Sequence, residues 1–380
     1  MRLRIFNTLR KILDMKTVLL MCCLVASVIS KTPVSLKMGC QQSTTSAVDC
    51  SFQFTNVADE DYYLLKRDTP LEGLHSSFVS VSRDGVPLQY EGCHFYRAPP
   101  QKDEFILLKA GESVTASAQI NNIFTFSSDG MYNIRYNKPL EVLLKDKMEL
   151  QSDSEDIHVE EVDLMKVEVS ESVDIQLENT DLLSRPVKEE VKESDEVYME
   201  SCDNVAKFVG GSAAVRAETV LAHNKLCKGL IHARSEVGNN QRYRTWFGAY
   251  TRRRMNTVRN KFWQAFERIM DNCVTYDFNG RACDRLNNNN RAVYAYSCYH
   301  NNAMFMCKGF AGLPTFCNRR NARTNKEGLF AGFWTRIAGN TKLDRDRLKV
   351  SECRRLARNN PNRAVNNVGN YGFYYCAVAA

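Results

Sequence analysis

The first part of the chain carries short apolar runs separated by turn residues, a pattern typical of β structure. Residues 78–82 alternate between apolar and polar side chains and lead into Arg83, Asp84 and Gly85, as in a β-hairpin. Similar runs recur at 105–108, 114–116 and 132–136. Short strands at this regular spacing predict an immunoglobulin-like β-sandwich over residues 31–143.

Further along the chain, apolar residues recur at helical rather than strand spacing. After Thr251 they follow steps of three and four residues, at Met255, Val258, Phe262, Phe266 and Ile269. Such a stripe predicts a helix that begins after Thr251 and packs its apolar side against a core. We therefore expect residues 201–380 to form a second, mainly helical domain, so that the whole chain is an α+β protein of more than one domain.

Between these two parts lies a strongly acidic segment, residues 144–200. From residue 146 onward it holds nineteen Asp and Glu against five Lys and Arg, and it has no Cys, Gly, Phe or Trp. Such a composition buries too little apolar surface to offset the entropy lost on ordering, so we predict a disordered linker. The alternation of Val and Leu between Val159 and Val169 also allows a transient strand there.

The N-terminus has the pattern of an export signal over residues 1–30. An apolar run from Val18 to Ile29 follows Lys16, and the small residue Ser30 precedes Lys31. This run is too short to span a bilayer, and no later segment reaches the ~20 apolar residues that a membrane helix needs. The pattern predicts a secreted, extracellular protein without a membrane span.

Twelve of the fourteen cysteines lie beyond the predicted signal. An even and high count after an export signal favours disulfides, and no CxxC pair or Cys/His cluster has the spacing of a zinc site. Cys40, Cys50 and Cys93 fall in the predicted sandwich, so one of the three is either free or bridged to the other domain. His223 and Cys227 lie four residues apart, and we expect Cys227 to be in a disulfide rather than to act as a nucleophile.

Charge separates the chain into an acidic middle and a basic end. Residues 201–380 hold thirty Lys and Arg against eleven Asp and Glu. A secreted domain of this charge attracts polyanions such as glycosaminoglycans, anionic microbial surfaces or nucleic acid. The densest candidates, near the aromatic residues Tyr243, Trp246 and Tyr250, are Arg252, Arg253, Arg254, Arg354, Arg355 and Arg358. Any one of these clusters is equally well explained as a solvated basic face.

Several motifs of the basic part resemble one family of zinc peptidases. They are Tyr243 to Gly248, Met306 to Phe310, Gly339 to Thr341 with Asp344, and Arg355 to Pro361 followed by Ala364 to Asn367. Their order and spacing resemble the deuterolysin-type, peptidyl-Lys metalloendopeptidases. The run from Leu108 to Val114 is similar to the N-terminal sandwich of the precursors of that family. The resemblance implies a zincin-like C-terminal domain with a small sheet, and it implies a disulfide from Cys202 to a cysteine within 273–307, with Cys283 as the candidate.

The family carries its zinc-binding His-Glu-x-x-His motif just before the segment matched by Gly339 to Asp344. Aligned on Thr335 and Arg336, the three functional places hold Leu329, Phe330 and Phe333. A slip of one residue gives Phe330, Ala331 and Trp334 instead. Neither register supplies a metal ligand or a base, although Asp344 retains the place of the third ligand. Arg347 stands where the family has a tyrosine.

Two structural hypotheses follow for this apolar segment, and three functional ones for the protein. The bulky side chains either fill a core or line an apolar cleft. We expect a catalytically inactive homologue without a cofactor, which acts by binding an anionic surface or an extracellular protein partner. One alternative is an active peptidase that holds zinc through other ligands. The other alternative is a cationic defence or extracellular-matrix protein.

Overall fold

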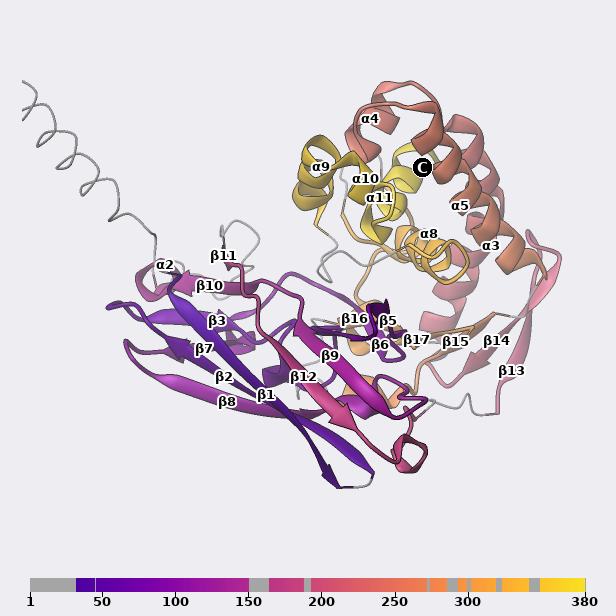
Figure 1. Ribbon diagram of the computed structural model, residues 1–380. Coiled ribbons are helices and arrows are strands. Elements are labelled where there is room, and N and C mark those ends of the chain that lie inside the picture. The colour runs from indigo at the N-terminus through magenta and orange to yellow at the C-terminus, as the bar shows by residue number, and fades with distance from the viewer. Residues whose placement is uncertain are drawn as a thin grey trace, which may run out of the picture.

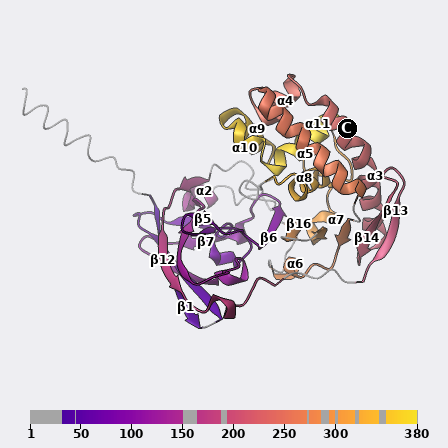
Figure 2. The ribbon, with the colours of Figure 1, turned by 45° about the vertical axis from the view of Figure 1, so that its right-hand side comes forward.

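The computed structural model describes residues 32–44, 46–149, 164–187, 193–271, 274–285, 293–298, 302–318, 323–341 and 349–379 (Figure 1). A β-rich region forms one end of the molecule, and helices stacked on a mixed sheet form the other (Figures 1 and 2). The α+β class is therefore confirmed. The predicted signal at 1–30 lies outside the described residues. Among the residues described, no helix is both long and apolar enough to cross a membrane.

Three antiparallel sheets build the β-rich region. In the first, β1 (Val34–Thr44) pairs with β2 (Ala47–Asn56), which pairs with β8 (Ser113–Gln119). The second has the order β11 (Met165–Val167), β10 (Leu140–Leu144), β3 (Tyr62–Leu65), β7 (Phe105–Leu108). The third has the order β12 (Ser172–Leu177), β9 (Gly130–Tyr136), β4 (Val79–Arg83), β5 (Val86–Pro87). Short 3-10 turns interrupt the chain at Pro70–Glu72, Lys102–Glu104, Ile120–Asn122 and Thr180–Leu182, and α2 (Lys145–Glu149) follows β10.

One apolar core joins the three sheets. Phe52 from the first, Leu64 from the second and Ile134 from the third belong to the same buried cluster, each at most 1% exposed. Alternation explains this, because successive residues of a strand point to opposite faces and only one face is apolar. The strands expected from the pattern at 78–82, 105–108, 114–116 and 132–136 are confirmed. The immunoglobulin-like topology stays a prediction.

The prediction of a disordered acidic linker is wrong for residues 164–187 and 193–200. There β11 and β12 join the sheets of the β-rich region, and β13 (Asp195–Met199) joins the sheet of the C-terminal region. Along β12, Ile175 and Leu177 are buried whereas Asp174 is exposed. The acidic side chains thus remain in water while every second residue contributes to the core. The composition of the whole segment does not reveal this alternation. Residues 150–163 and 188–192 lie outside the described parts.

The C-terminal region contains a six-stranded sheet. Its order is β13, β14 (Asn204–Val209), β15 (Thr275–Asp277), β17 (Ala303–Met306), β16 (Val293–Cys298), β6 (Cys93–Arg97). Strands β14, β15 and β17 are mutually parallel, and β16 runs antiparallel to β17. Its helices are α3 (Ala213–Glu236), α4 (Gln241–Phe247), α5 (Arg252–Asp271), α6 (Arg281–Arg285), α7 (Lys308–Ala311), α8 (Lys326–Ile337), α9 (Val350–Asn359), α10 (Pro361–Ala364) and α11 (Val368–Ala379). The longer helices gather on one side of the sheet (Figure 1).

Helix α5 has the predicted position and the predicted stripe. It begins directly after Thr251, whose hydroxyl accepts a hydrogen bond from the Arg254 amide at 3.2 Å. Val258, Phe262 and Ile269 are fully buried, and they pack in the main core of the C-terminal region. The stripe is therefore core rather than a membrane face.

Five disulfides link cysteines within the described residues. Cys93 bridges to Cys298, which confirms the alternative of a bond between the two regions, and Cys40 pairs with Cys50 across β1 and β2. The pairing of Cys202 with Cys283, implied by the family resemblance, is wrong. Cys202 follows β13 and lies over α3, where its Cα is 5.6 Å from that of Cys227, whereas Cys283 of α6 pairs with Cys307, which follows β17. The fifth bond joins Cys317 to Cys376.

Candidate functional site

Helix α8 carries the positions that align with the family's zinc motif. The side chain of Asn325 caps its start by accepting a hydrogen bond from the Gly328 amide at 2.8 Å. Leu329 is 4% exposed, and Phe330 and Phe333 are 0% exposed. In the register shifted by one residue, Ala331 and Trp334 are also completely buried. Phe330, Phe333 and Trp334 therefore fill the core and do not line an open cleft, whereas Leu329 forms part of the wall of a cleft between α8 and α11.

Aromatic partners surround the α8 side chains from three directions. The ring of Phe330 stacks on Tyr276 of β15 with centroids 5.1 Å apart, and on Phe310 at 5.8 Å. Phe333 lies 5.6 Å from Tyr96 of β6. A ring pair in such tilted or stacked geometry adds to the free energy already gained by burial. The positions that align with the zinc motif are thus occupied by apolar side chains that pack against other rings.

The described residues do not fit a zinc ion held by α8. Among them the single group of three candidate ligands is Cys202, His223 and Cys227, whose ligand atoms lie within 4.8 Å of one another. The two sulfur atoms of that group are joined in a disulfide, so neither is a thiolate ligand. Asp344 and Arg347, the remaining positions of the degenerate motif, lie in residues 342–348, outside the described parts of the chain.

His223 lies fully buried on α3 beside that disulfide. Its Nδ1 atom is 2.6 Å from the hydroxyl of Tyr276, and its Nε2 atom has no hydrogen-bond partner. Burial lowers the pKa of His223 to about 4 and raises the pKa of Tyr276. Both side chains are therefore neutral near pH 7. The pair is a hydrogen bond between two neutral groups inside the core, and Cys227 is confirmed as a disulfide cysteine.

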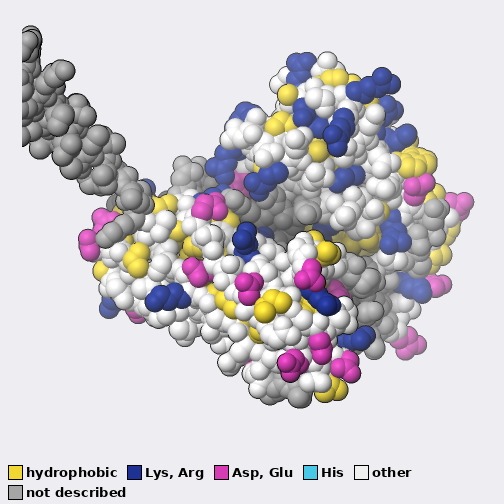
Figure 3. Space-filling model, in the orientation of Figure 1, with side chains coloured by type: hydrophobic (Ala, Val, Ile, Leu, Met, Phe, Trp, Pro, Cys, Tyr) yellow, Lys and Arg dark blue, Asp and Glu magenta, His cyan; other side chains and the backbone are white. Residues whose placement is uncertain are grey.

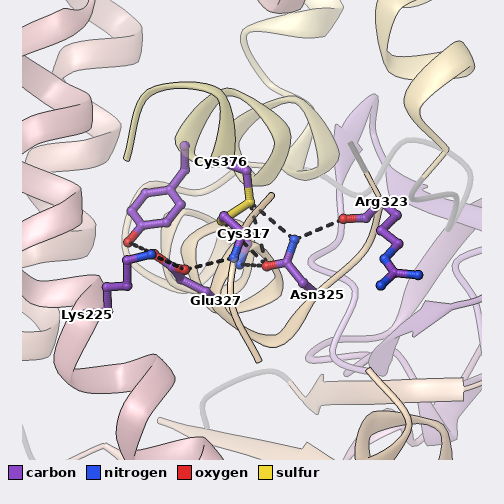
Figure 4. The surroundings of a disulfide bond; sticks show 8 residues. Lys225, Cys317, Arg323, Asn325, Glu327 and Cys376 are labelled. Carbon is purple, nitrogen blue, oxygen red and sulfur yellow. Dashed lines mark hydrogen bonds and ion pairs between the residues drawn. A yellow bond between two sulfur atoms is a disulfide. The ribbon is translucent and has the colours of Figure 1, made fainter. Parts of the chain in front are cut away.

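Two charged residues in the first turn of α8 form a site that sequence reasoning missed. The Glu327 carboxylate is 0% exposed and accepts hydrogen bonds from the Tyr375 hydroxyl at 2.7 Å and the Cys317 amide at 3.0 Å (Figure 4). The ammonium group of Lys225 lies 3.2 Å away. The adjacent Lys326 is also buried, and pairs with Glu218 while donating to the Leu313 carbonyl at 2.9 Å. A Glu in the first turn of a helix was the available signal, because the helix dipole favours an anion there.

A small cleft lies between α8 and α11. Its floor consists of glycines from both helices, because a Cβ atom at Gly372 would lie 2.6 Å from the Gly328 carbonyl oxygen. Tyr96 of β6 forms part of the wall, and Arg323 stands at the rim, with its side chain extending away from the Cys317–Cys376 disulfide (Figure 4). The cleft is apolar and contains no acid or base suited to hydrolysis among its lining residues.

The arginines proposed to bind polyanions lie on the outer helices. Arg252 and Arg253 at the start of α5 are exposed, as are Arg354, Arg355 and Arg358 on α9. Helices α5 and α10 are joined by a hydrogen bond from Arg254 to the Asn362 side chain at 3.1 Å, and α10 follows α9 directly. In Figure 3, Lys and Arg side chains spread over the helical part, whereas Asp and Glu gather mainly over the β-rich part.

Two of the three aromatic residues expected beside these arginines are buried. Tyr243 is 0% exposed and Trp246 3% exposed, and both pack inside the C-terminal region. The Arg354 guanidinium lies 5.0 Å above the ring of Trp246. The expectation of accessible aromatics is therefore wrong for Tyr243 and Trp246, whereas Tyr250 is half-buried.

The chain is similar to known proteins over different parts of its length. A solved zinc peptidase from Grifola frondosa superposes with a TM-score of 0.35 and 19% identity, over 44% of this chain and 96% of its own. A protein named extracellular protease from Aeromonas hydrophila is 27% identical over 357 residues, which cover 94% of this chain and 95% of that protein. The profile of the lysine-specific metallo-endopeptidases matches residues 232–376. This C-terminal part of the chain is therefore similar to the lysine-specific metallo-endopeptidases.

Proposed function

We propose that the protein is a secreted, catalytically inactive member of this family that acts by binding an anionic partner. The observation that carries the proposal is the burial of Leu329, Phe330 and Phe333 where the family has two zinc-binding histidines and a glutamate. A buried Leu or Phe stabilises a fold by ~1.5–3 kcal/mol. An unpaired carboxylate or imidazole at the same place destabilises it. Helix α8 thus supports the fold and supplies no catalytic group.

The basic surface supports the binding half of the proposal. Exposed arginines on α5 and α9 face water with few acidic neighbours, and the Arg355–Glu352 pair at 3.7 Å is partly exposed. A surface of this kind neutralises phosphate or sulfate groups and releases counterions, so its affinity falls steeply with salt. Five disulfides and an extracellular relative fit a partner outside the cell, either an anionic surface or an acidic protein.

One observation favours a second candidate, an active peptidase. The Aeromonas hydrophila relative is named a protease, and the similarity extends over almost its full length. Under this hypothesis the zinc ligands come from residues other than those of α8.

Elemental analysis and a peptidase assay separate the two candidates. The protein purified from its secreted form is expected to contain no stoichiometric zinc and to leave lysine-containing peptides intact, with or without added zinc. One zinc per chain together with chelator-sensitive cleavage would show the second candidate to be correct. The same preparation is expected to bind a heparin column and to elute with rising salt. Passage through the column at low salt would contradict the anionic partner.

A further inference from the structure

A histidine and the two sulfur atoms of a disulfide meet inside the core of the C-terminal region. His223 and Cys227 lie one turn apart on α3, and Cys202 reaches them from the segment that follows β13. One ligand atom of each residue lies within 4.8 Å of the other two. Metal–sulfur bonds measure ~2.3 Å, so the ligands of one ion lie at most ~4.6 Å apart. The three side chains have nearly this spacing before any movement.

The imidazole of His223 has a nitrogen without a hydrogen-bond partner among the described residues. Its Nδ1 atom lies 2.6 Å from the Tyr276 hydroxyl, which leaves Nε2 unpaired in a side chain that is 0% exposed. Burial lowers the pKa of His223 to about 4, so near pH 7 the ring is neutral and a metal ion does not have to displace a second proton from it. A metal-binding histidine almost always has a hydrogen bond at its other nitrogen, which orients the ring. Tyr276 supplies that contact.

Contacts other than the disulfide hold Cys202 over α3. The amide of Ser201 donates to the Asn224 side chain at 3.0 Å, and the amide of Cys202 donates to the Met199 carbonyl at 3.0 Å. β13, which precedes this segment, pairs along its whole length with β14. Opening of the disulfide therefore leaves both sulfur atoms next to His223.

We propose that in the reduced protein Cys202, His223 and Cys227 hold one Cu⁺ ion through two thiolates and the Nε2 atom. Thiolates and imidazole are ligands of soft cations, and Cu⁺ accepts three of them. Zn²⁺ is almost always four-coordinate, and the group has no fourth His, Cys, Asp or Glu in the described part of the chain. The three side chains are at most 2% exposed, so the ion has no position open to a substrate. The site is thus separate from both candidate functions and does not depend on them.

The metal site and the disulfide are alternative states of the same side chains. A dithiol reductant gives two electrons and two protons to the pair, which breaks the S–S bond and leaves the reductant as a cyclic disulfide. Cu⁺ then displaces the two thiol protons and bonds to both sulfur atoms. The ion therefore binds only while the disulfide is open.

Copper retention against a chelator tests the third ligand in the whole protein. The protein is reduced with dithiothreitol without oxygen, the reductant is removed, and Cu⁺ is added together with bathocuproine disulfonate as competitor. His223→Leu is expected to bind the first Cu⁺ at least tenfold more weakly than the unmodified protein. The matched control His232→Leu removes an exposed histidine from the same helix and is expected to bind as the unmodified protein does. Equal affinity of His223→Leu and the unmodified protein would overturn the inference.

Two double variants identify the thiolates. Cys202→Ser/Cys227→Ser is expected to bind the first Cu⁺ at least tenfold more weakly than the reduced unmodified protein. The control Cys40→Ser/Cys50→Ser removes a different disulfide and is expected to keep the tight site. The same affinity for the first ion in the two double variants would contradict the inference, because other reduced cysteines would then account for the copper.

X-ray absorption at the copper edge needs no variant. The reduced protein, loaded with one equivalent of Cu⁺, is expected to show one nitrogen and two sulfur neighbours around the ion. Sulfur neighbours alone would show that His223 is not a ligand and would overturn the inference, whether or not any variant folds.

Discussion

Helices α8 and α9 lie in the same region of the molecule but differ in almost every property. From Lys326 to Thr335 every residue of α8 is buried, whereas on α9 only Cys353 and Ala357 are. α8 is enclosed by α3, α5 and α11, and α9 packs mainly on α4 and α10. The first helix holds the apolar residues Leu329, Phe330 and Phe333, and the second presents three exposed arginines. The comparison teaches that the same region contains a helix whose residues contribute to the core and a helix whose charged residues are open to solvent.

Placing the residues of the zinc motif on α8 is expected to lower the free energy of unfolding more than any other change. The variant Leu329→His/Phe330→Glu/Phe333→His places three polar groups where the exposed fraction is 4% or less. We expect a loss of more than about 5 kcal/mol in the free energy of unfolding, because two rings are removed and a carboxylate is buried without a partner. Denaturant unfolding followed by circular dichroism measures it, with the volume-conserving Leu329→Met as control. A folded variant that binds one zinc would show that α8 has retained a metal-binding geometry.

Removal of Glu327 tests the one charged cluster inside α8. The variant Glu327→Ala takes a carboxylate away from Lys225, Tyr375 and the Cys317 amide. We expect a loss of about 3 kcal/mol, since breaking a buried, hydrogen-bonded pair leaves its partners unsatisfied. Glu267→Ala, on the exposed side of α5, is the matched control and is expected to change the free energy of unfolding by less than about 0.5 kcal/mol. Equal losses in the two variants would mean that the interior and the surface are not energetically distinct.

Acidification probes the interior without any mutation. The pKa of His223 is about 4 in the folded protein, against 6.5 for an ordinary histidine. Between these values the unfolded chain binds a proton that the folded protein does not, so stability falls as the pH decreases. The contribution of His223 to the free energy of unfolding is fully present above pH 6.5. Lowering the pH to 4 removes about 3 kcal/mol of stability. In the variant His223→Leu the free energy of unfolding is expected to depend less steeply on pH over this range. An unchanged pH dependence would contradict the burial of a neutral imidazole.

Charge removal on α9 is expected to have the smallest effect on stability and a clear effect on binding. In Arg354→Gln/Arg355→Gln/Arg358→Gln the free energy of unfolding changes by no more than about 1 kcal/mol, mainly through the stacking of Arg354 on Trp246. Elution from heparin is expected at distinctly lower salt. A matched variant, Lys37→Gln/Lys109→Gln/Arg135→Gln, removes the same charge from the β-rich region and is expected to leave elution nearly unchanged. Equal shifts would mean that net charge alone determines binding.

Local pattern was sufficient to predict the elements whose partners are close in sequence. The stripe of Val258, Phe262 and Ile269 on α5 determines which side of that helix is buried, whatever it packs against. The absence of polar residues at Leu329, Phe330 and Phe333 likewise predicted the apolar character of α8. The sequence did not predict that these side chains are buried, because apolar side chains that fill a core and apolar side chains that line a cleft have the same sequence pattern.

Long-range pairing could not be predicted. Cys93 to Arg97 have the pattern of any short strand, and nothing local indicates that they join a sheet formed almost entirely by residues beyond position 190. The position of Cys202 over α3, which decides its pairing with Cys227, depends on how β14 and α3 pack. For β12 the relevant signal was present, as an alternation in Val173, Ile175 and Leu177, but it was outweighed by the acidic composition around it.

The bridge between Cys93 and Cys298 determines what a single nick in the backbone does to this molecule. A protease that cleaved anywhere between these two cysteines would create two polypeptides, but they would remain one particle. The two pieces would migrate together on a gel without reductant and separately with it. The N-terminal piece would then be a permanent light chain rather than a fragment discarded on maturation, and every mature molecule would retain both acidic and basic halves.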